Sequence, residues 1–522
     1  MAIVWIWRGI GLRDRHAQHI QRPAGCEELD GEASLALVGA EDAVLVLGSG
    51  WPGCGLLPPS VWVLNNEADS YRMRRDGGGA ALRRRAGTAM QAESAGWGGM
   101  KSGVGGVEDP EVRMRLREAG LTVVDSSIGR LYLVQLFHLE VIMLQRINDR
   151  GQPLGRSLLQ VQNGAEAEYR REGFGKSSTQ GTRPEWDKDP LLRRVVRTAL
   201  RAAYALQLDL AEVEVVLGDE GQTAVRGAWP LSDAPELRPA LGRFAAWYTA
   251  ARGGAGAGSG QLLIGADPEF VLVRADGRIA SAARYLHGGA WDGAGTDALV
   301  VGGRVLRPVA ELRPEPAANP AALAANVRRL LAIAAARISE PGLRWAAGAM
   351  PVPGLPLGGH IHLSGVPLSS RLLRLLDSYA AFPLAMVEDP AGRGRRPRYG
   401  ALGDFRLQGH GGFEYRTLPS WLVSPAAAKA AFALAMLCAR EAWNLSYIPA
   451  LEERYVTAYY TGDRDALAET LPAIAASLAA TASYPDYAAY IEPLLEAAAR
   501  GVTWNERTDF RPKWRIGGSS II

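Results

Sequence analysis

The stretch Gly358-Gly-His-Ile-His-Leu-Ser364 has the alternating pattern of a β-strand preceded by two glycines. Successive side chains of a strand point to opposite faces of the sheet, so His360, His362 and Ser364 would share one face. The two apolar residues between them would enter a core. The glycines would let a nucleotide or a neighbouring backbone approach closely. Taken alone, two histidines and a hydroxyl on one face fit either a site or a half-exposed surface.

Three further segments place a pair of ionisable residues on one face of a predicted strand. The pairs are Asp267 with Glu269, Glu311 with Arg313, and Glu414 with Arg416. One such pair is common on a solvated sheet face. Together with the two histidines they make four pairs within one region of the chain, and we expect them to form one shared site.

These side chains suit phosphate chemistry. Carboxylates on an otherwise apolar strand are costly to bury unless they are paired or bound to a cation. Carboxylate oxygens are ligands for Mg²⁺, which keeps further positions for phosphate. Arginines beside them match the charge of a phosphoryl group in transfer. The chain has no HExxH motif, no GxSxG motif and no Cys–His pair, so nothing indicates a zincin, a serine hydrolase or a thiol protease.

The composition is that of an ordinary globular protein. Its 522 residues are too many for one compact core, and two or three domains are expected. Hydrophobic residues make up 48% of the chain and charged residues 22%, which is typical of a protein that folds in water. The formal net charge of +3 is small for this length, so nucleic acid is not expected as an obligatory partner.

The cysteines and the N-terminal residues bear on the compartment. Cys26, Cys54 and Cys438 are scattered and odd in number, which fits neither a disulfide framework nor a metal site. The first residues lack the basic region and the long apolar run of a signal peptide. No uninterrupted apolar run approaches the length that crosses a bilayer. We therefore expect a soluble cytoplasmic protein without a membrane partner.

A glycine-rich segment divides the chain. Residues 252–260, Arg-Gly-Gly-Ala-Gly-Ala-Gly-Ser-Gly, have almost no side chains that could pack, and they are expected to form a flexible linker. The predicted domains are therefore residues 1–251 and 261–522. In the second domain the Asp276-Gly277 turn predicts a hairpin. Helices are expected there at residues 319–336, 369–387, 425–443 and 465–480.

The first domain resembles an ATP-grasp domain of α/β type over about residues 40–230. The resemblance rests on a closing helix and strand, residues 191–206 and 209–217. In that family the next strand ends in acidic and asparagine metal ligands, whereas residues 223–229 contain neither, and a lysine usual near residues 72–79 is missing. The resemblance therefore implies a degenerate module used for substrate delivery or as a scaffold.

The second domain resembles the phage-type carboxylate–amine ligases (amidoligases, type 2), which are related to glutamate–cysteine ligase and glutamine synthetase. The resemblance covers about residues 261–515. It implies an α+β fold in which a curved antiparallel sheet forms an open funnel and helices cover one face. Four motifs in order carry it: Gly265-Ala-Asp-Pro-Glu-Phe270, Ala310-Glu-Leu-Arg-Pro314, Gly358-Gly-His-Ile-His-Leu-Ser364 and Phe413-Glu-Tyr-Arg-Thr-Leu418.

This second resemblance also implies an activity, namely ATP- and Mg²⁺-dependent formation of an amide through an acyl phosphate. Small-molecule or peptide carboxylates and amines would be the substrates. The implied residues are Glu269, Glu311 and Glu414 for metal binding; His360, His362 and Ser364 for nucleotide, phosphate or metal contact; and Arg416, Arg406, Arg313 and Asp297 for the phosphoryl group and the amine. The carboxylates rank ahead of the histidines as metal ligands.

Two other classes of function stay open at this point. One is a non-catalytic protein that binds nucleotides or peptides on an inactivated ligase fold. The other is a metal-dependent amide hydrolase built around His360 and His362. The sequence names neither substrate, and it does not indicate an oligomeric state.

Overall fold

The structure is a computed structural model with two compact units, residues 1–257 and 258–522, which are described separately. The change of unit falls inside the predicted linker, of which residues 253–260 lie outside the described part. The exact domain boundaries stay a prediction. The structure describes residues 2–7, 25–29, 32–47, 51–58, 60–65, 109–125, 128–159, 185–231, 234–252, 261–286, 293–301, 304–409 and 411–516.

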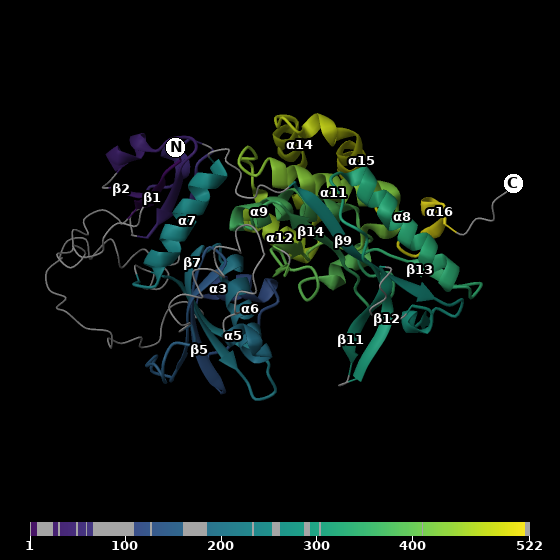
Figure 1. Cartoon of the computed structure of the whole chain (residues 1–522), viewed down its shortest axis with the longest axis horizontal. Helices are drawn as coiled ribbons and strands as arrows, with labels where there is room; N and C mark the ends of the chain where they lie inside the picture. The colour runs from purple at the N-terminus through teal and green to yellow at the C-terminus, as the bar shows by residue number, and fades with distance from the viewer. Residues whose placement is uncertain are drawn as a thin grey trace. The chain divides into compact units, whose positions relative to one another are not determined.

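The N-terminal unit contains a parallel sheet with the strand order β2-β1-β3-β4 (Figure 1). Its central strands are apolar at every position and buried on both faces, as parallel strands usually are. The carboxylate of Asp42 accepts hydrogen bonds from the backbone of Ile3 and from the indole of Trp5, both at 2.8 Å, and so joins the first strand to the third. The strands are β1 (Val4–Trp7), β2 (Cys26–Leu29), β3 (Ala43–Val46) and β4 (Trp62–Leu64).

The same unit contains an antiparallel sheet with the order β6-β5-β7-β8. Helices α3 and α6 pack on one face of it through buried aliphatic side chains. Helix α6 begins at Pro190 because the carboxylate of Asp189 caps it, accepting from the backbone of Leu191 at 2.7 Å. The elements are α3 (Pro110–Glu118), β5 (Arg130–Phe137), β6 (Glu140–Ile147), α5 (Glu185–Lys188), α6 (Pro190–Ala205), β7 (Leu210–Leu217), β8 (Thr223–Pro230) and α7 (Leu237–Arg252).

Strand β8 carries an arginine in the segment where the ATP-grasp pattern has its metal ligands. Arg226 donates from Nε to Oε2 of Glu214 on β7 at 2.8 Å, and Glu214 is almost completely buried. A cation of the protein thus already neutralises this carboxylate. The ATP-grasp likeness and its degenerate form stay predictions.

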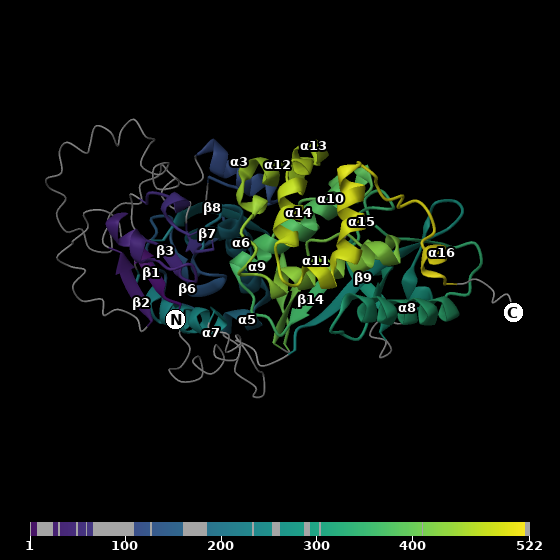
Figure 2. The same ribbon diagram turned by 90° about the horizontal axis from the view of Figure 1, so that it is seen from above.

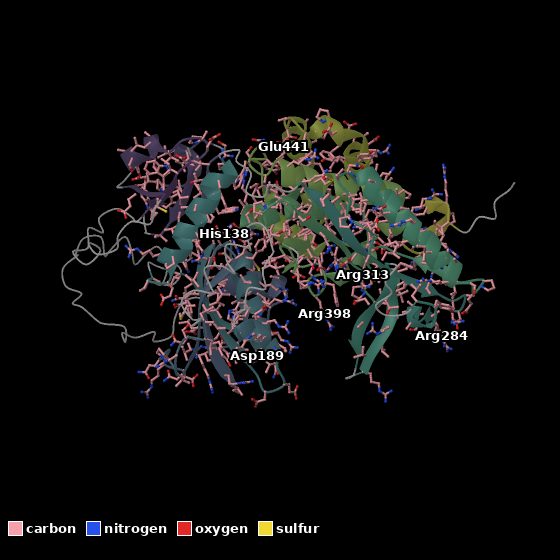
Figure 3. All side chains as sticks on the ribbon, viewed as in Figure 1. His138, Asp189, Arg284, Arg313, Arg398 and Glu441 are labelled. Carbon is pink, nitrogen blue, oxygen red and sulfur yellow. The ribbon has the colours of Figure 1, made fainter. Side chains whose placement is uncertain are left out.

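A cluster of aromatic rings surrounds His138 at the turn between β5 and β6. The imidazole lies 4.8 Å from the ring of Phe244 and 5.4 Å from that of Trp247, both on α7, and 5.1 Å from that of Trp62 (Figure 3). The backbone N–H of His138 donates to the carbonyl of Asp209 at 2.7 Å. Burial lowers the pKa of His138 to about 3, so this imidazole is neutral in the folded protein.

The neutral His138 should make the N-terminal unit sensitive to acid. In the unfolded chain His138 is protonated below about pH 6.5, whereas in the folded chain it stays neutral down to about pH 3. Its contribution to the free energy of unfolding is therefore fully present above pH 6.5 and is lost as the pH falls. We expect a loss of about 2 kcal/mol between pH 7.5 and pH 5. Denaturant unfolding across this range should show it. His138→Asn, which tolerates the positive φ of 46°, should be less stable at neutral pH but should lack this part of the slope; an unchanged slope contradicts the assignment.

The C-terminal unit is built on a curled antiparallel sheet with the order β11-β12-β9-β14-β16-β15 (Figure 1). The predicted hairpin at Asp276-Gly277 is present, since β9 turns there and pairs with β10. The predicted strand at residues 358–364 is β14, which lies between β9 and β16. The strands are β9 (Leu263–Val273), β10 (Ile279–Ala280), β11 (Ala294–Val301), β12 (Arg304–Leu312), β13 (Arg344–Ala346), β14 (Gly359–Ser364), β15 (Phe405–Leu407) and β16 (Gly412–Tyr415).

Helices lie over one side of this sheet (Figures 1 and 2), as the fold prediction requires. The expected helix at residues 369–387 is α9 and α10 joined by one π-helical turn, Asp377–Ala381. The helix expected at residues 465–480 is instead two helices, because Pro472 begins a new one. The helices are α8 (Pro320–Arg337), α9 (Ser370–Leu376), α10 (Phe382–Val387), α11 (Pro425–Arg440), α12 (Glu453–Thr461), α13 (Arg464–Ala468), α14 (Leu471–Ala479), α15 (Ala488–Ala499) and α16 (Arg511–Trp514).

Among the described residues of both units, no helix is at once long enough and apolar enough to span a membrane. Two of the three cysteines, Cys26 and Cys438, are buried.

Candidate active site

The strand registers bring the predicted residues onto one face of the β11-β12-β9-β14-β16-β15 sheet. Residues directly opposite each other on paired strands share a face. Asp297 belongs to this face too, since it pairs with Val309, two residues before Glu311. The register pairs are Glu311 with Glu269, Asp267 with His360, His362 with both Gly265 and Glu414, and Glu414 with Arg406. The four pairs of ionisable residues therefore do meet on a single surface.

The two glycines before the histidine strand are required by close neighbours. A Cβ on Gly358 would lie 2.4 Å from Nε2 of His360, and a Cβ on Gly359 would lie 2.4 Å from the carbonyl oxygen of Pro419. The indole of Trp421 also contacts Gly359 and donates to its carbonyl at 2.9 Å. Of the two expected reasons for these glycines, the approach of a neighbouring backbone is present at Gly359, whereas the close neighbour of Gly358 is the imidazole of His360.

Glu414 is the most heavily bonded residue described on this face. Its side chain is completely buried and accepts from Nδ1 of His360 at 3.1 Å and from Nε of Arg406 at 2.7 Å. Arg416 and Gln408 donate to it as well. Burial alone would raise its pKa, but the hydrogen bond from His360 and the charges of Arg416 and Arg406 hold the pKa at about 2. The carboxylate is therefore ionised at any working pH.

Glu269 and Glu311 form an acidic pair on β9 and β12. Oε2 of Glu269 accepts from the backbone N–H of Gly358 at 2.6 Å, and Arg313 donates to Glu311. Burial raises the pKa of Glu269 to about 8 against that hydrogen bond, and the charges of Asp297 and Glu311 raise it further. Burial likewise raises the pKa of Glu311 to about 7, although Arg313 opposes it. Neighbouring groups of the protein offset only part of the negative charge of these two carboxylates. The pair is therefore suited to bind a cation.

A second group of side chains could also hold a cation. Asp267, His362 and Glu414 each offer one ligand atom, and these atoms lie within 4.8 Å of one another. Nε2 of His362 is 2.9 Å from Oδ2 of Asp267, yet this buried nitrogen has no hydrogen-bond partner in the described part of the chain. The distance alone would suggest an ion pair. The missing hydrogen bond makes the contact a better fit to two ligands of one cation.

The remaining predicted residues lie toward the edges of the face. Asp297 is exposed on β11, next to a shift in register, and no hydrogen bond of its side chain is described. Arg313 follows β12 directly and its side chain is 44% exposed (Figure 3). Ser364 ends β14, where it pairs with Leu263 and Gly412 and is partly buried.

Two residues of the site were not assigned a role from the sequence. Asp267 was noted in the strand pattern but not chosen as a ligand. Arg395 is buried and donates to the carbonyls of Thr417 and Leu418, both at 2.7 Å, and its charge lowers the pKa of both Glu269 and His360. It belongs to a run of four arginines between residues 393 and 398, and no spacing in that run distinguishes it.

Residues 264–516 match the model of the phage phiEco32-like COOH.NH2 ligase-type 2 family. The C-terminal unit belongs to this family. The match begins in β9 and ends after α16, so it includes every residue of the face described above. It leaves out the N-terminal unit, and we refer to residues 258–522 as the ligase unit. Among curated proteins, no match to the chain is found.

Two solved structures resemble the chain weakly. A bifunctional glutathione synthetase from Pasteurella multocida has 13% identity and a TM-score of 0.28, over 49% of this chain and 48% of its own. GmaS, solved without ligand, has 17% identity and a TM-score of 0.28, over 45% of this chain and 69% of its own. The chain thus spans about half the length of the glutathione synthetase that it matches. Similarity at this level carries no argument about activity.

Proposed function

We propose that the ligase unit joins a carboxylate to an amine by an ATP- and Mg²⁺-dependent reaction that passes through an acyl phosphate. The observation that carries the proposal is the single sheet face on which buried carboxylates lie beside arginines that are bonded to them. Carboxylates of this kind hold the metal of a nucleotide, and arginines stabilise a phosphoryl group in transfer. Membership of a carboxylate–amine ligase family supports the same reaction class.

The carboxylate oxygens on this face fit Mg²⁺, whereas the imidazole of His362 is a more usual ligand for a transition metal. Glu269 and Glu311 would supply oxygens at one end, and Asp267, His362 and Glu414 would supply the group described above. Bound there, Mg²⁺ would neutralise the charge of the ATP phosphates. His360 would keep Glu414 in place through its hydrogen bond, and Ser364 would offer a hydroxyl toward the nucleotide.

The reaction itself needs two displacements. An oxygen of the substrate carboxylate attacks the γ-phosphorus of ATP and ADP leaves, and then the amine nitrogen attacks the acyl carbon and phosphate leaves. Arg416 and Arg406, which are both paired with Glu414, would stabilise the phosphoryl charge, and Arg313, which is paired with Glu311, would assist them. Asp297 is exposed and would bind the amine or accept the proton that it loses.

For the N-terminal unit we propose a degenerate ATP-grasp module that delivers substrate or acts as a scaffold. The ion pair between Arg226 and Glu214 is compatible with this role, because a carboxylate that already has a cationic partner is less available to a metal ion. We also propose a cytoplasmic protein, on the grounds of its few scattered cysteines.

Release of ADP from the full chain tests the ligase proposal. The purified protein is incubated with ATP, Mg²⁺ and pools of amino acids and short peptides, and ADP is measured with and without each pool. We expect release only when a carboxylate and an amine are both present, and its loss when EDTA is added. Amide cleavage without ATP would instead assign a hydrolase, and ATP binding without turnover in every pool would assign a binding protein.

A further inference from the structure

A buried carboxylate behind the sheet joins the two strands that carry the arginines of the site. Asp377 is completely buried and begins the π-helical turn between α9 and α10. Its Oδ1 accepts from the hydroxyl of Tyr415 at 2.6 Å and from the backbone N–H of Gly403 at 3.0 Å. Single π-helical turns of this kind are often found at functional sites.

Each of these two contacts fixes a neighbour of the site. Tyr415 lies on β16 between Glu414 and Arg416, with its side chain on the opposite face of the strand. Gly403 lies two residues before β15, the strand that carries Arg406. One carboxylate oxygen therefore holds the backbone before β15 and a side chain of β16, the two segments that flank the Arg406–Glu414–Arg416 contacts.

The segment from residue 400 to 404 is held at other points as well. The hydroxyl of Tyr459 on α12 donates to the carbonyl of Gly400 at 2.8 Å, and the backbone N–H of Arg416 donates to the carbonyl of Asp404 at 2.9 Å. Thr417 donates to the carbonyl of Ala401 at 2.8 Å. Asp377 differs from these groups because it bonds the segment and β16 at the same oxygen.

We propose that Asp377 is a positioning residue of the ligase unit, which sets Arg406 and Arg416 against Glu414 from the helical layer behind the sheet. Without its carboxylate, the buried hydroxyl of Tyr415 and the N–H of Gly403 lose their acceptor, and β15 and β16 lose their common anchor. The effect on turnover rests on the proposed function. Because phosphoryl transfer depends on placement, kcat should fall while the KM values for ATP and the amine change little.

Three variants and one matched control test this role. Asp377→Ala should lower kcat by between about 10-fold and about 100-fold. Tyr415→Phe should lower kcat less, and the double variant should resemble Asp377→Ala, because both single changes remove the same contact. The control is Tyr379→Phe in the same π-helical turn; it loses bonds to Tyr447 and Ser477 and should keep the kcat of the parent chain.

Hydrogen exchange gives a readout that does not need turnover. In the ligand-free full chain, Asp377→Ala should speed amide exchange in residues 402–407 and 413–417, and Tyr379→Phe should not. If Asp377→Ala does not fold, Tyr415→Phe and its comparison with Tyr379→Phe test the same contact. Equal exchange in the Asp377 and Tyr379 variants, or a kcat of Asp377→Ala equal to that of the parent chain, would overturn the proposal. If Asp377→Ala speeds exchange but the parent chain has no ligase activity, the structural role of Asp377 would stand and only the proposed function would be rejected.

Discussion

Replacing Glu414 with glutamine should lower turnover at least about a hundredfold while the chain stays folded. The carboxylate is completely buried and is ionised at any working pH, since its pKa is held at about 2. Glutamine has nearly the same volume and keeps one acceptor for His360, but it removes the charge that Arg406 and Arg416 share. It also removes an anionic ligand from the Asp267–His362–Glu414 group, so divalent cations should bind more weakly.

ADP release and Mn²⁺ titration, each on the full chain, measure the two effects of Glu414→Gln. Circular dichroism and the unfolding midpoint show whether the variant is folded. Glu506→Gln is a matched control in the same unit: Glu506 is also buried, accepts from the backbone of Met350 at 2.9 Å, and has a pKa that burial raises to about 7. It should keep turnover and Mn²⁺ affinity. If the folded Glu414→Gln variant turned over like the parent chain, the proposed role of Glu414 in the active site would be wrong.

The residues that share a face within each strand of the site could be predicted from local sequence alone. Alternation on a strand decides which side chains share a face, and this holds separately for β9, β14 and β16. Once those strands pair, the residues at i and i+2 of each must lie side by side. The pairing of β14 with β9 and β16 then brings the polar face of Gly358–Ser364 beside Asp267 and Glu414.

The partners across strands could not be predicted in the same way. Which residue opposes which depends on the register of strands that are far apart in the sequence, and a shift of two residues preserves every face. The register places His362 between Gly265 and Glu414, next to the carboxylate of Asp267. From the sequence we expected the carboxylates to be metal ligands ahead of the histidines. In the structure, His362 lies in one group of possible ligands with the carboxylates of Asp267 and Glu414.

The roles of residues in loops and in the helical layer also could not be predicted from sequence patterns. Arg395 is one of several arginines in an irregular segment, and its burial follows from the carbonyls of Thr417 and Leu418 that it contacts. Asp377 lies inside a stretch whose apolar spacing predicts a regular helix. The direction in which the Asp377 side chain points depends on a π-helical turn, and the apolar spacing does not predict that turn.

The second large effect concerns pH, and it arises because Glu269 holds its proton in the folded chain. Its pKa rises from an ordinary value of 4.5 to about 8, chiefly through burial. Below pH 4.5 both folded and unfolded chains keep the proton. As the pH rises toward 8 the unfolded chain releases it and the folded chain does not, so the free energy of unfolding should fall across this window. Without a divalent cation we expect Glu269 to account for a loss on the order of 3 kcal/mol between pH 5 and pH 8.

Comparison with Glu269→Gln isolates this group from others that shift in the same direction, such as Glu311 and Glu506. Glutamine keeps an oxygen for the N–H of Gly358 but has no proton to lose. The unfolding free energies of the variant and the parent are measured by denaturant titration at several pH values. The stability of the variant relative to the parent should increase as the pH rises.

Mg²⁺ should stabilise the parent most at high pH, because the ion binds the deprotonated carboxylate and its binding releases the proton. The same ion should do little for Glu269→Gln. A difference that is constant with pH would mean that Glu269 is already ionised in the folded protein, and the acidic pair would then need a permanent partner other than a bound cation.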